Sequence, residues 1–188
     1  MKKITFLFLA FLSLSILALK NKTSEETKSI NWVSFEEAIK LQEKTPKKII
    51  VDVYTVWCGP CKMMMANTFT HPYIIDYINK NYYAVKFNAE GPDDVTVKGH
   101  TFKNPNYNPE RANSRNGTHE LASSIAAVNG SIAYPTLVYF DEKLNIMQAI
   151  QGYQTPQQLE PILKFFGEDH YKTTKWEVFY STFKTETK

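Results

Sequence analysis

The chain has 188 residues, of which 43% are hydrophobic and 22% are charged. This composition excludes a largely disordered chain and suits one globular domain with embellishments. The formal net charge is +3, but three of the lysines (Lys2, Lys3 and Lys20) lie in the first 20 residues, so the remainder is neutral. A neutral remainder gives no support for nucleic-acid binding, and we expect no nucleic-acid partner.

The N-terminus has the pattern of an export signal. Two lysines precede the apolar run 4–19, which is typical of a secretory signal and short for a membrane-spanning helix. A buried N-terminal helix is the alternative, although the run has no charged positions. We therefore expect residues 1–20 to be a signal peptide or an N-terminal anchor, followed by a polar tether at 21–30. The predicted location is periplasmic or otherwise extracytoplasmic, either free or tethered to the membrane by an uncleaved N-terminal segment.

The folded part is expected to begin at residue 31. Residues 31–33 predict a short edge strand, and Ser34 with Glu37 forms a capping-box signal for an amphipathic helix through about Glu43. The run 49–54 (IIVDVY) is rich in β-branched residues and predicts a buried strand.

The two cysteines of the chain follow that strand directly, in the segment 57–62 (WCGPCK). Good helix formers come after Cys61, and Pro60 suits the first turn of a helix. Cys58 is therefore expected at a helix N-terminus, where free N–H groups and the helix dipole favour its thiolate. Cys61 lies one turn later, so the pattern predicts a redox-active pair.

Three other interpretations of these residue types were weighed. A zinc half-site needs two more ligands, and the four histidines offer neither a close pair nor a zinc-type spacing. A purely structural disulfide gains little stability from so short a loop. The run of methionines at 63–65 favours packing over a copper site. We expect no metal and no cofactor other than the Cys58–Cys61 disulfide.

The segment 51–62 resembles the active-site segment of the thioredoxin superfamily, and the resemblance extends from about Asn31 to Phe166, apart from an insertion at 91–118. Residues 65–90 are similar to extracytoplasmic members such as the reducing domains of DsbD-type proteins. The resemblance implies an α/β thioredoxin fold with a central mixed β-sheet flanked by helices. It also implies an insertion after the second central strand and an extra C-terminal helix.

The resemblance also implies residue roles. Cys58 would be the nucleophile and Cys61 the resolving thiol. Asp52 resembles the buried acid that manages the proton of the resolving thiol, and Lys86 matches the lysine that accompanies it. A structural acid at a strand end is the alternative for Asp52, and a simple exposed strand residue is the alternative for Lys86.

Pro135 resembles the cis-proline that faces the cysteines, with an ordinary trans proline before a strand as the alternative. Tyr134 departs from the small or β-branched residue that is usual at this position. The predicted substrate-binding residues are Trp57, Gly59, Pro60, Tyr134, Pro135, Gly152 and Tyr153.

The remaining elements follow from period and turn signals. The pattern predicts a helix from Pro72, a strand at 82–88, a hairpin at 95–102, a helix from 118 or 119 to about 128 closed by Asn129-Gly130, and antiparallel strands at 137–140 and 145–151. Thr155, Pro156 and Gln158 form a capping-box signal for a final helix that ends at Phe166. Residues 31–188 would form one domain with a C-terminal extension at 167–188.

Two segments have open interpretations. The insertion at 91–118 is either a peripheral decoration or a lip beside the redox site that selects partners. In the extension, residues 174–177 form another capping-box signal. The aromatic stripe that follows either docks onto its own domain or binds a partner; it comprises Trp176, Phe179, Tyr180 and Phe183.

These features predict an exported thiol–disulfide oxidoreductase that reduces disulfides of envelope proteins. Gly-Pro between the cysteines is the pairing of thioredoxin itself. Because a dithiol outside the cytoplasm becomes oxidised, we expect an upstream membrane or envelope electron donor. The alternatives are a disulfide oxidase or isomerase, or a partner-binding module without turnover. We expect a monomer.

Overall fold

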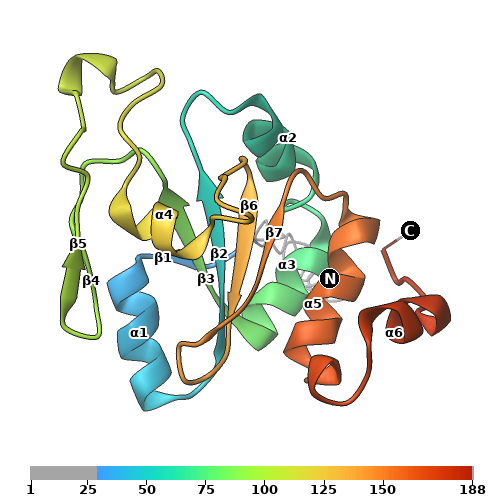
Figure 1. Ribbon diagram of the computed structural model, residues 1–188. Coiled ribbons are helices and arrows are strands. Elements are labelled where there is room, and N and C mark those ends of the chain that lie inside the picture. The colour runs from blue at the N-terminus through green and yellow to red at the C-terminus, as the bar shows by residue number, and fades with distance from the viewer. Residues whose placement is uncertain (1–28, 188) are drawn as a thin grey trace, which may run out of the picture.

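The computed structural model describes residues 29–187, which form a central sheet between helices (Figure 1). The five-stranded sheet has the order β1 (Trp32–Val33), β3 (Tyr82–Asn88), β2 (Lys48–Tyr54), β6 (Thr136–Phe140) and β7 (Ile146–Gln151). A separate hairpin pairs β4 (Val95–Val97) with β5 (His100–Phe102). The helices are α1 (Phe35–Lys44), α2 (Gly59–Asn67), α3 (Pro72–Asn81), α4 (Glu120–Ile125), α5 (Pro156–Gly167) and α6 (Trp176–Thr182), with short 3₁₀ turns at Pro109–Arg111 and His170–Lys172.

The sheet is mixed, as the sequence predicts. β2 runs parallel to β3 and antiparallel to β6, and β6 pairs antiparallel with β7. Helices α2 and α3 form the connection between the parallel strands, since parallel neighbours need a long crossover. The α/β thioredoxin fold expected from the resemblance is therefore confirmed.

Helices cover both faces of the sheet (Figure 1): α1 and α4 lie on one face, and α3 and α5 lie on the other. Strand β2 supplies both cores because its side chains alternate between the faces. Ile49, Val51 and Val53 pack with α1 and α4, whereas Ile50 packs with α3 and α5. Asp52 lies two residues after Ile50 on the strand, so its side chain is directed toward the same α3 and α5 face.

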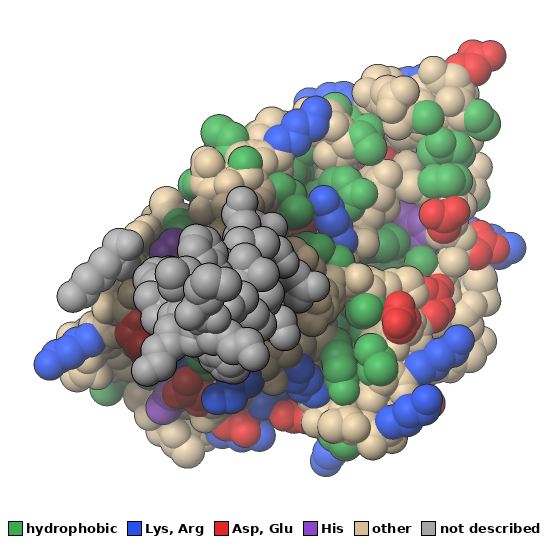
Figure 2. All heavy atoms as spheres, turned by 180° about the vertical axis from the view of Figure 1, so that it is seen from behind, with side chains coloured by type: hydrophobic (Ala, Val, Ile, Leu, Met, Phe, Trp, Pro, Cys, Tyr) green, Lys and Arg blue, Asp and Glu red, His purple; other side chains and the backbone are tan. Residues whose placement is uncertain are grey.

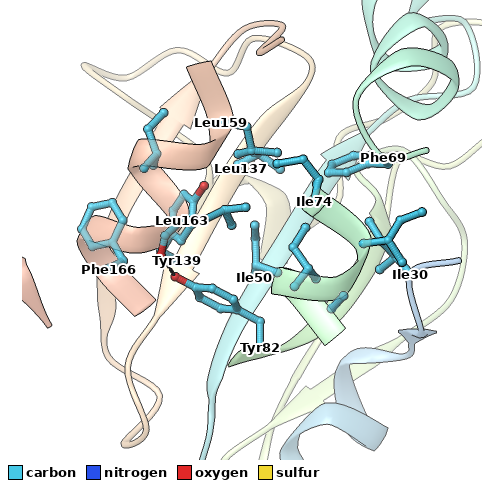
Figure 3. Packing of buried hydrophobic residues seen from close by; sticks show 14 of the residues in the cluster. Ile30, Ile50, Phe69, Ile74, Tyr82, Leu137, Tyr139, Leu159, Leu163 and Phe166 are labelled. Carbon is cyan, nitrogen blue, oxygen red and sulfur yellow. Dashed lines mark hydrogen bonds between the residues drawn. The ribbon is translucent and has the colours of Figure 1, made fainter. Parts of the chain in front are cut away.

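The core on the α3 and α5 face is dominated by aromatic and branched side chains. Figure 3 shows Ile50 and Tyr82 close to Tyr139, Leu163 and Phe166. The Tyr139 and Phe166 rings stack with centroids 4.8 Å apart. The hydroxyl of Tyr82 donates a 2.7 Å hydrogen bond to the Leu163 carbonyl, so this buried polar group is satisfied.

Helix starts agree with the sequence at two of three capping signals. The Ser34 side chain accepts a hydrogen bond from the Glu37 N–H, and Thr155 with Gln158 forms a complete capping box. The predicted capping box at Thr174 is wrong: α6 starts one residue later, with Lys175 at the N-cap and no side-chain hydrogen bond.

The predicted end of the fourth helix is also wrong. Helix α4 ends at Ile125 instead of continuing to about residue 128. Asn129 and Gly130 both have positive φ (51° and 78°) and connect a β-bridge between Val128 and Ser131. Two successive positive φ angles are typical of a tight hairpin turn, so this pair closes a turn and does not cap a helix.

The C-terminal extension folds back onto α5. The Phe165 ring contacts Trp176 and Phe179 at centroid distances of 5.3 and 5.2 Å, so these two residues of the aromatic stripe dock onto their own domain. Tyr180 of the same stripe is 53% exposed. Glu160, which is fully buried, accepts hydrogen bonds from the Glu186 and Thr187 N–H groups, both at 2.9 Å. This carboxylate therefore anchors the chain that follows α6.

At the other end, Ile30 is 4% exposed and belongs to the core, although the sequence places it at the end of the tether. The side chain of Asn79 bonds to the backbone of Ser29 and Asn31. The predicted signal segment and most of the tether lie outside the described residues. Between residues 29 and 187, no helix is long and apolar enough to cross a membrane.

Figure 2 shows the molecule from behind the view of Figure 1. Outside the area that grey atoms cover, basic and acidic side chains are interspersed on this face, with hydrophobic side chains between them. The part of this face that the grey atoms leave visible has no large patch of side chains of one charge.

Candidate active site

The two cysteines lie where β2 passes into α2. Cys58 is the N-cap of α2, and its Sγ accepts the backbone N–H of Cys61 at 3.1 Å. The two residues form a disulfide with their Cα atoms 5.3 Å apart. Both are nearly buried, at 2% and 4% exposure. After reduction, the same N–H group and the free N–H groups of the first helical turn would favour a Cys58 thiolate.

A cis peptide bond between Tyr134 and Pro135 precedes β6. The Gly152 N–H donates a 2.7 Å hydrogen bond to the Pro135 carbonyl, which ties this turn to the end of β7. The Tyr134 ring meets the Trp57 ring edge to face at 5.9 Å. Burial raises the pKa of the Tyr134 hydroxyl, which is hydrogen-bonded to the side chain of Thr118.

An open groove of about 710 Å³ lies between the cysteine turn and the cis-proline turn. Its lining comprises Trp57, Cys58, Gly59, Pro60, Glu90, Arg115, Thr118, Ser123, Gly130, Ile132, Ala133 and Tyr134. Four of the predicted substrate-binding residues line the groove together: Trp57, Gly59, Pro60 and Tyr134. Gly152 instead supports the cis-proline turn from behind, and Tyr153 packs against the core on the α3 and α5 face.

The insertion forms one wall of this groove. Glu90 accepts the Trp57 indole N–H at 2.7 Å and the Asn116 backbone N–H at 2.9 Å, both on the same oxygen. The guanidinium of Arg115 lies 4.1 Å from the centroid of the Trp57 ring. The end of the insertion therefore lies beside the redox site, and its role in selecting partners stays a prediction.

A second hollow, of about 530 Å³, opens on the other side of the disulfide. It is lined by Tyr54, Thr55, Val56, Cys61, Lys62, Met65, Ala66 and Lys86. The three methionines differ in their surroundings: Met64 is fully buried, Met65 lines this hollow, and Met63 is half exposed.

Asp52 is buried on β2, the strand that leads to the cysteines, and is 2% exposed. Burial raises the pKa of its carboxyl to about 7, and the charge of Lys86, its register partner on β3, opposes this rise. One carboxyl oxygen has no hydrogen-bond partner among the described residues. The Lys86 ammonium lies 4.8 Å from the centroid of the Tyr54 ring. An acid of this kind changes charge close to neutral pH, which suits proton transfer.

The geometry also relates Asp52 to Cys61. Residues three apart on a helix share a face, so Cys61 is directed the same way as Met64. Met64 packs in the same core as Ile50, whose side chain shares the Asp52 face of β2. The alternation along β2 and the spacing along α2 therefore direct Asp52 and Cys61 toward the same face of the sheet.

The comparisons with known proteins agree with this geometry. A family model described as a thioredoxin-like domain matches residues 35–167. The chain belongs to the thioredoxin-like family. No curated protein matches the chain.

Three of the similar solved structures are weakly related to the thioredoxin-like chain in sequence. A DsbH oxidoreductase is 12% identical, with 80% of this chain and 92% of that chain covered and a TM-score of 0.53. A putative disulphide-isomerase from Bacteroides thetaiotaomicron is 24% identical, with 80% and 99% covered and a TM-score of 0.51. A DsbD C-terminal domain from Neisseria meningitidis is 16% identical, with 73% and 97% covered and a TM-score of 0.42. At these low identities, the DsbH and disulphide-isomerase structures show only that this chain has the same fold.

The two charged residues of the groove, Glu90 and Arg115, have no role in the sequence-based prediction. Glu90 lies two residues after the strand at 82–88, and ligand sites of open α/β sheets lie at such carboxyl ends, so this signal was present. Arg115 lies in an Asn- and Pro-rich stretch without periodicity, and no signal in the sequence connects it with Trp57.

Proposed function

We propose that the protein is an exported thiol–disulfide oxidoreductase that reduces disulfides of envelope proteins. The observation that best supports this proposal is the Cys58–Cys61 disulfide at the start of α2, beside a groove that ends at a cis-proline turn. Such a groove gives an extended peptide access to Cys58, and proline leaves the neighbouring backbone free to pair with it.

In the first step, the Cys58 thiolate attacks one sulfur of the substrate disulfide. A bond forms between Cys58 and that sulfur, the substrate S–S bond breaks, and the departing substrate thiolate takes a proton from solvent. The product is a mixed disulfide between Cys58 and the substrate.

In the second step, Cys61 transfers its proton to the Asp52 carboxylate and attacks the Cys58 sulfur. The bond to the substrate breaks, the second substrate thiolate leaves and is protonated, and the Cys58–Cys61 disulfide forms again. Two electrons have moved from the dithiol to the substrate. A pKa of about 7 for Asp52 supports its role as the proton acceptor.

Continued turnover requires a dithiol donor that reduces the Cys58–Cys61 disulfide. For an exported protein this donor would be a membrane or envelope partner, since the extracytoplasmic environment is oxidising. Export is supported by the apolar N-terminal run, which lies outside the described residues.

The direction of transfer is tested by the reduction potential. Equilibration of the purified protein with glutathione or dithiothreitol buffers should give a value near about −270 mV, that of thioredoxin. A value near about −120 mV, that of a strong oxidant, would assign the protein to the oxidase alternative.

The activity itself is tested by insulin reduction with dithiothreitol as the donor. We expect turnover that is lost in Cys58→Ser and an accumulated mixed disulfide in Cys61→Ser. Partner binding without turnover in the unmodified protein would instead support the binding module. Mixed disulfides that Cys61→Ser traps in whole cells would identify the substrates.

A further inference from the structure

The groove beside Cys58 has two charged residues with different surroundings. Glu90 is 7% exposed, and its carboxylate already accepts the Trp57 and Asn116 N–H groups. Arg115 is exposed, and among residues 29–187 it has no ion-pair partner. The exposed charge in this groove is therefore that of Arg115, whereas the Glu90 carboxylate is buried and hydrogen-bonded within the wall.

One contact positions the side chain of Arg115, and a hydrogen bond of the next residue positions its backbone. Its guanidinium lies over the Trp57 ring at 4.1 Å, and the next residue, Asn116, is held to Glu90 by its backbone. A planar guanidinium stacked on a ring keeps its N–H donors in the plane, where they remain free for a carboxylate. Because the group is already positioned, an ion pair with a ligand loses less side-chain entropy.

Arg115 is far from Cys58 in the chain, but the fold brings both residues to the same groove. It stacks on the residue that immediately precedes Cys58, and both residues line the same groove. A peptide whose cysteine is joined to Cys58 must place its neighbouring side chains along this wall.

We propose that Arg115 is a specificity-determining residue that binds a carboxylate next to the substrate's disulfide cysteine. This inference rests on the proposed function and adds the substrate class, namely disulfides flanked by Asp or Glu. Arg115 touches the substrate and takes no part in the electron transfer.

The test compares three synthetic peptides, each with one intramolecular disulfide. They are identical except that the residue beside one cysteine is Asp, Asn or Lys. kcat/KM is measured for each at low ionic strength, with dithiothreitol as the donor. We expect the Asp peptide to be reduced about two- to fivefold faster than the Asn peptide, the range of an exposed ion pair, and the Lys peptide to be slowest. Added salt should reduce this preference.

The variants Arg115→Gln and Arg111→Gln separate the local contact from the overall charge. Arg111 lies in the same insertion and is exposed, but it does not line the groove. We expect the Asp-to-Asn ratio to fall to about one in Arg115→Gln and to persist in Arg111→Gln. Arg115→Lys should retain part of the preference, because it keeps the charge without the planar stack. A change in Cys58 reactivity affects all three peptides equally and cancels in the ratio.

Equal rates for the three peptides in the unmodified protein overturn the inference and leave the proposed function standing. A preference that persists in Arg115→Gln, or that Arg111→Gln also removes, overturns it as well. Absence of turnover with every peptide, including the Asn peptide, overturns the proposed function and this inference together.

Discussion

Asp52 on β2 lies directly opposite Lys86 on β3, yet the carboxyl of Asp52 has a raised pKa of about 7. Burial disfavours the charged carboxylate more strongly than the neighbouring ammonium favours it. Lys86 is directed over the Tyr54 ring at the hollow next to Cys61, where solvent reaches it. The strand pair thus holds an acid that can exchange a proton near neutral pH.

The raised pKa of Asp52 predicts that Asp52→Asn stabilises the protein at alkaline pH. The native state holds the Asp52 proton up to a pH of about 7, whereas an unfolded Asp releases it near 3.8. The native state therefore loses stability relative to the variant as the pH rises between these values, and the loss is complete above about 7. We expect a stabilisation of up to about 4 kcal/mol at pH 8 in urea unfolding.

The stabilisation should vanish below about pH 4, where Asp52 is protonated in both states. Asp93→Asn, at an exposed position, is the matched control and should change stability by less than about 0.5 kcal/mol. Equal stability of Asp52→Asn and the unmodified protein at pH 8 would contradict a buried, ionised acid.

Because Lys86 lowers the pKa that burial raises at Asp52, replacing Lys86 should change the pH dependence of the step in which Cys61 resolves the mixed disulfide. Lys86→Met removes the cation that lowers the pKa of Asp52, so this pKa should rise above about 7. The pH at which the mixed disulfide is resolved at half its maximal rate would then be higher. Single-turnover release of substrate, followed between pH 5 and 10, measures this shift.

In Asp52→Asn the attack of Cys61 on the mixed disulfide should be slower, while formation of the mixed disulfide is unchanged. Slower formation of the mixed disulfide in this variant would remove Asp52 from this role.

The two hydrogen bonds that Glu90 accepts are expected to stabilise the wall of the groove. Glu90→Ala leaves the Trp57 and Asn116 N–H groups without their acceptor, which should cost about 1.5–3 kcal/mol in urea unfolding. The variant should also lose the preference for acidic peptides, because Arg115 is no longer held over Trp57. Glu110→Ala, at an exposed position of the same insertion, is the control and should change stability by less than about 0.5 kcal/mol. Equal effects of the two variants would show that Glu90 does not organise the wall.

The hydrogen bonds that Glu160 accepts are expected to hold residues 185–187 against the domain. Burial opposes its charge, but hydrogen bonds from Thr185, Glu186 and Thr187 prevail and hold its pKa below the ordinary value of 4.5. Glu160→Gln should destabilise the protein by about 1–3 kcal/mol and speed hydrogen exchange at residues 186 and 187. This contribution is present above about pH 4.5 and is lost as the pH falls through the lower native pKa, so the two proteins should converge in acid. Slow exchange at 186 and 187 in the variant would contradict the anchor.

Much of the fold could be predicted because its signals are local. The run 49–54 is apolar enough to be buried on both faces of a sheet, and Thr155 with Pro156 and Gln158 marks a helix start through neighbouring atoms alone. The predictions failed where two local structures share one signal. Asn129-Gly130 suits both a helix end and a tight turn, and the pairing of Val128 with Ser131 selected the turn.

The sequence by itself determined the redox pair, the strand that leads into it and the family, because those residues are contiguous and their spacing sets the chemistry. Tertiary structure decided which side chains face that pair. Asp52 gains its raised pKa from burial between strands, and Arg115 reaches Trp57 only because Glu90, 33 residues beyond Trp57, holds both the indole and the insertion. Such contacts join residues that are far apart in the chain, so the spacing of neighbouring residues does not predict them.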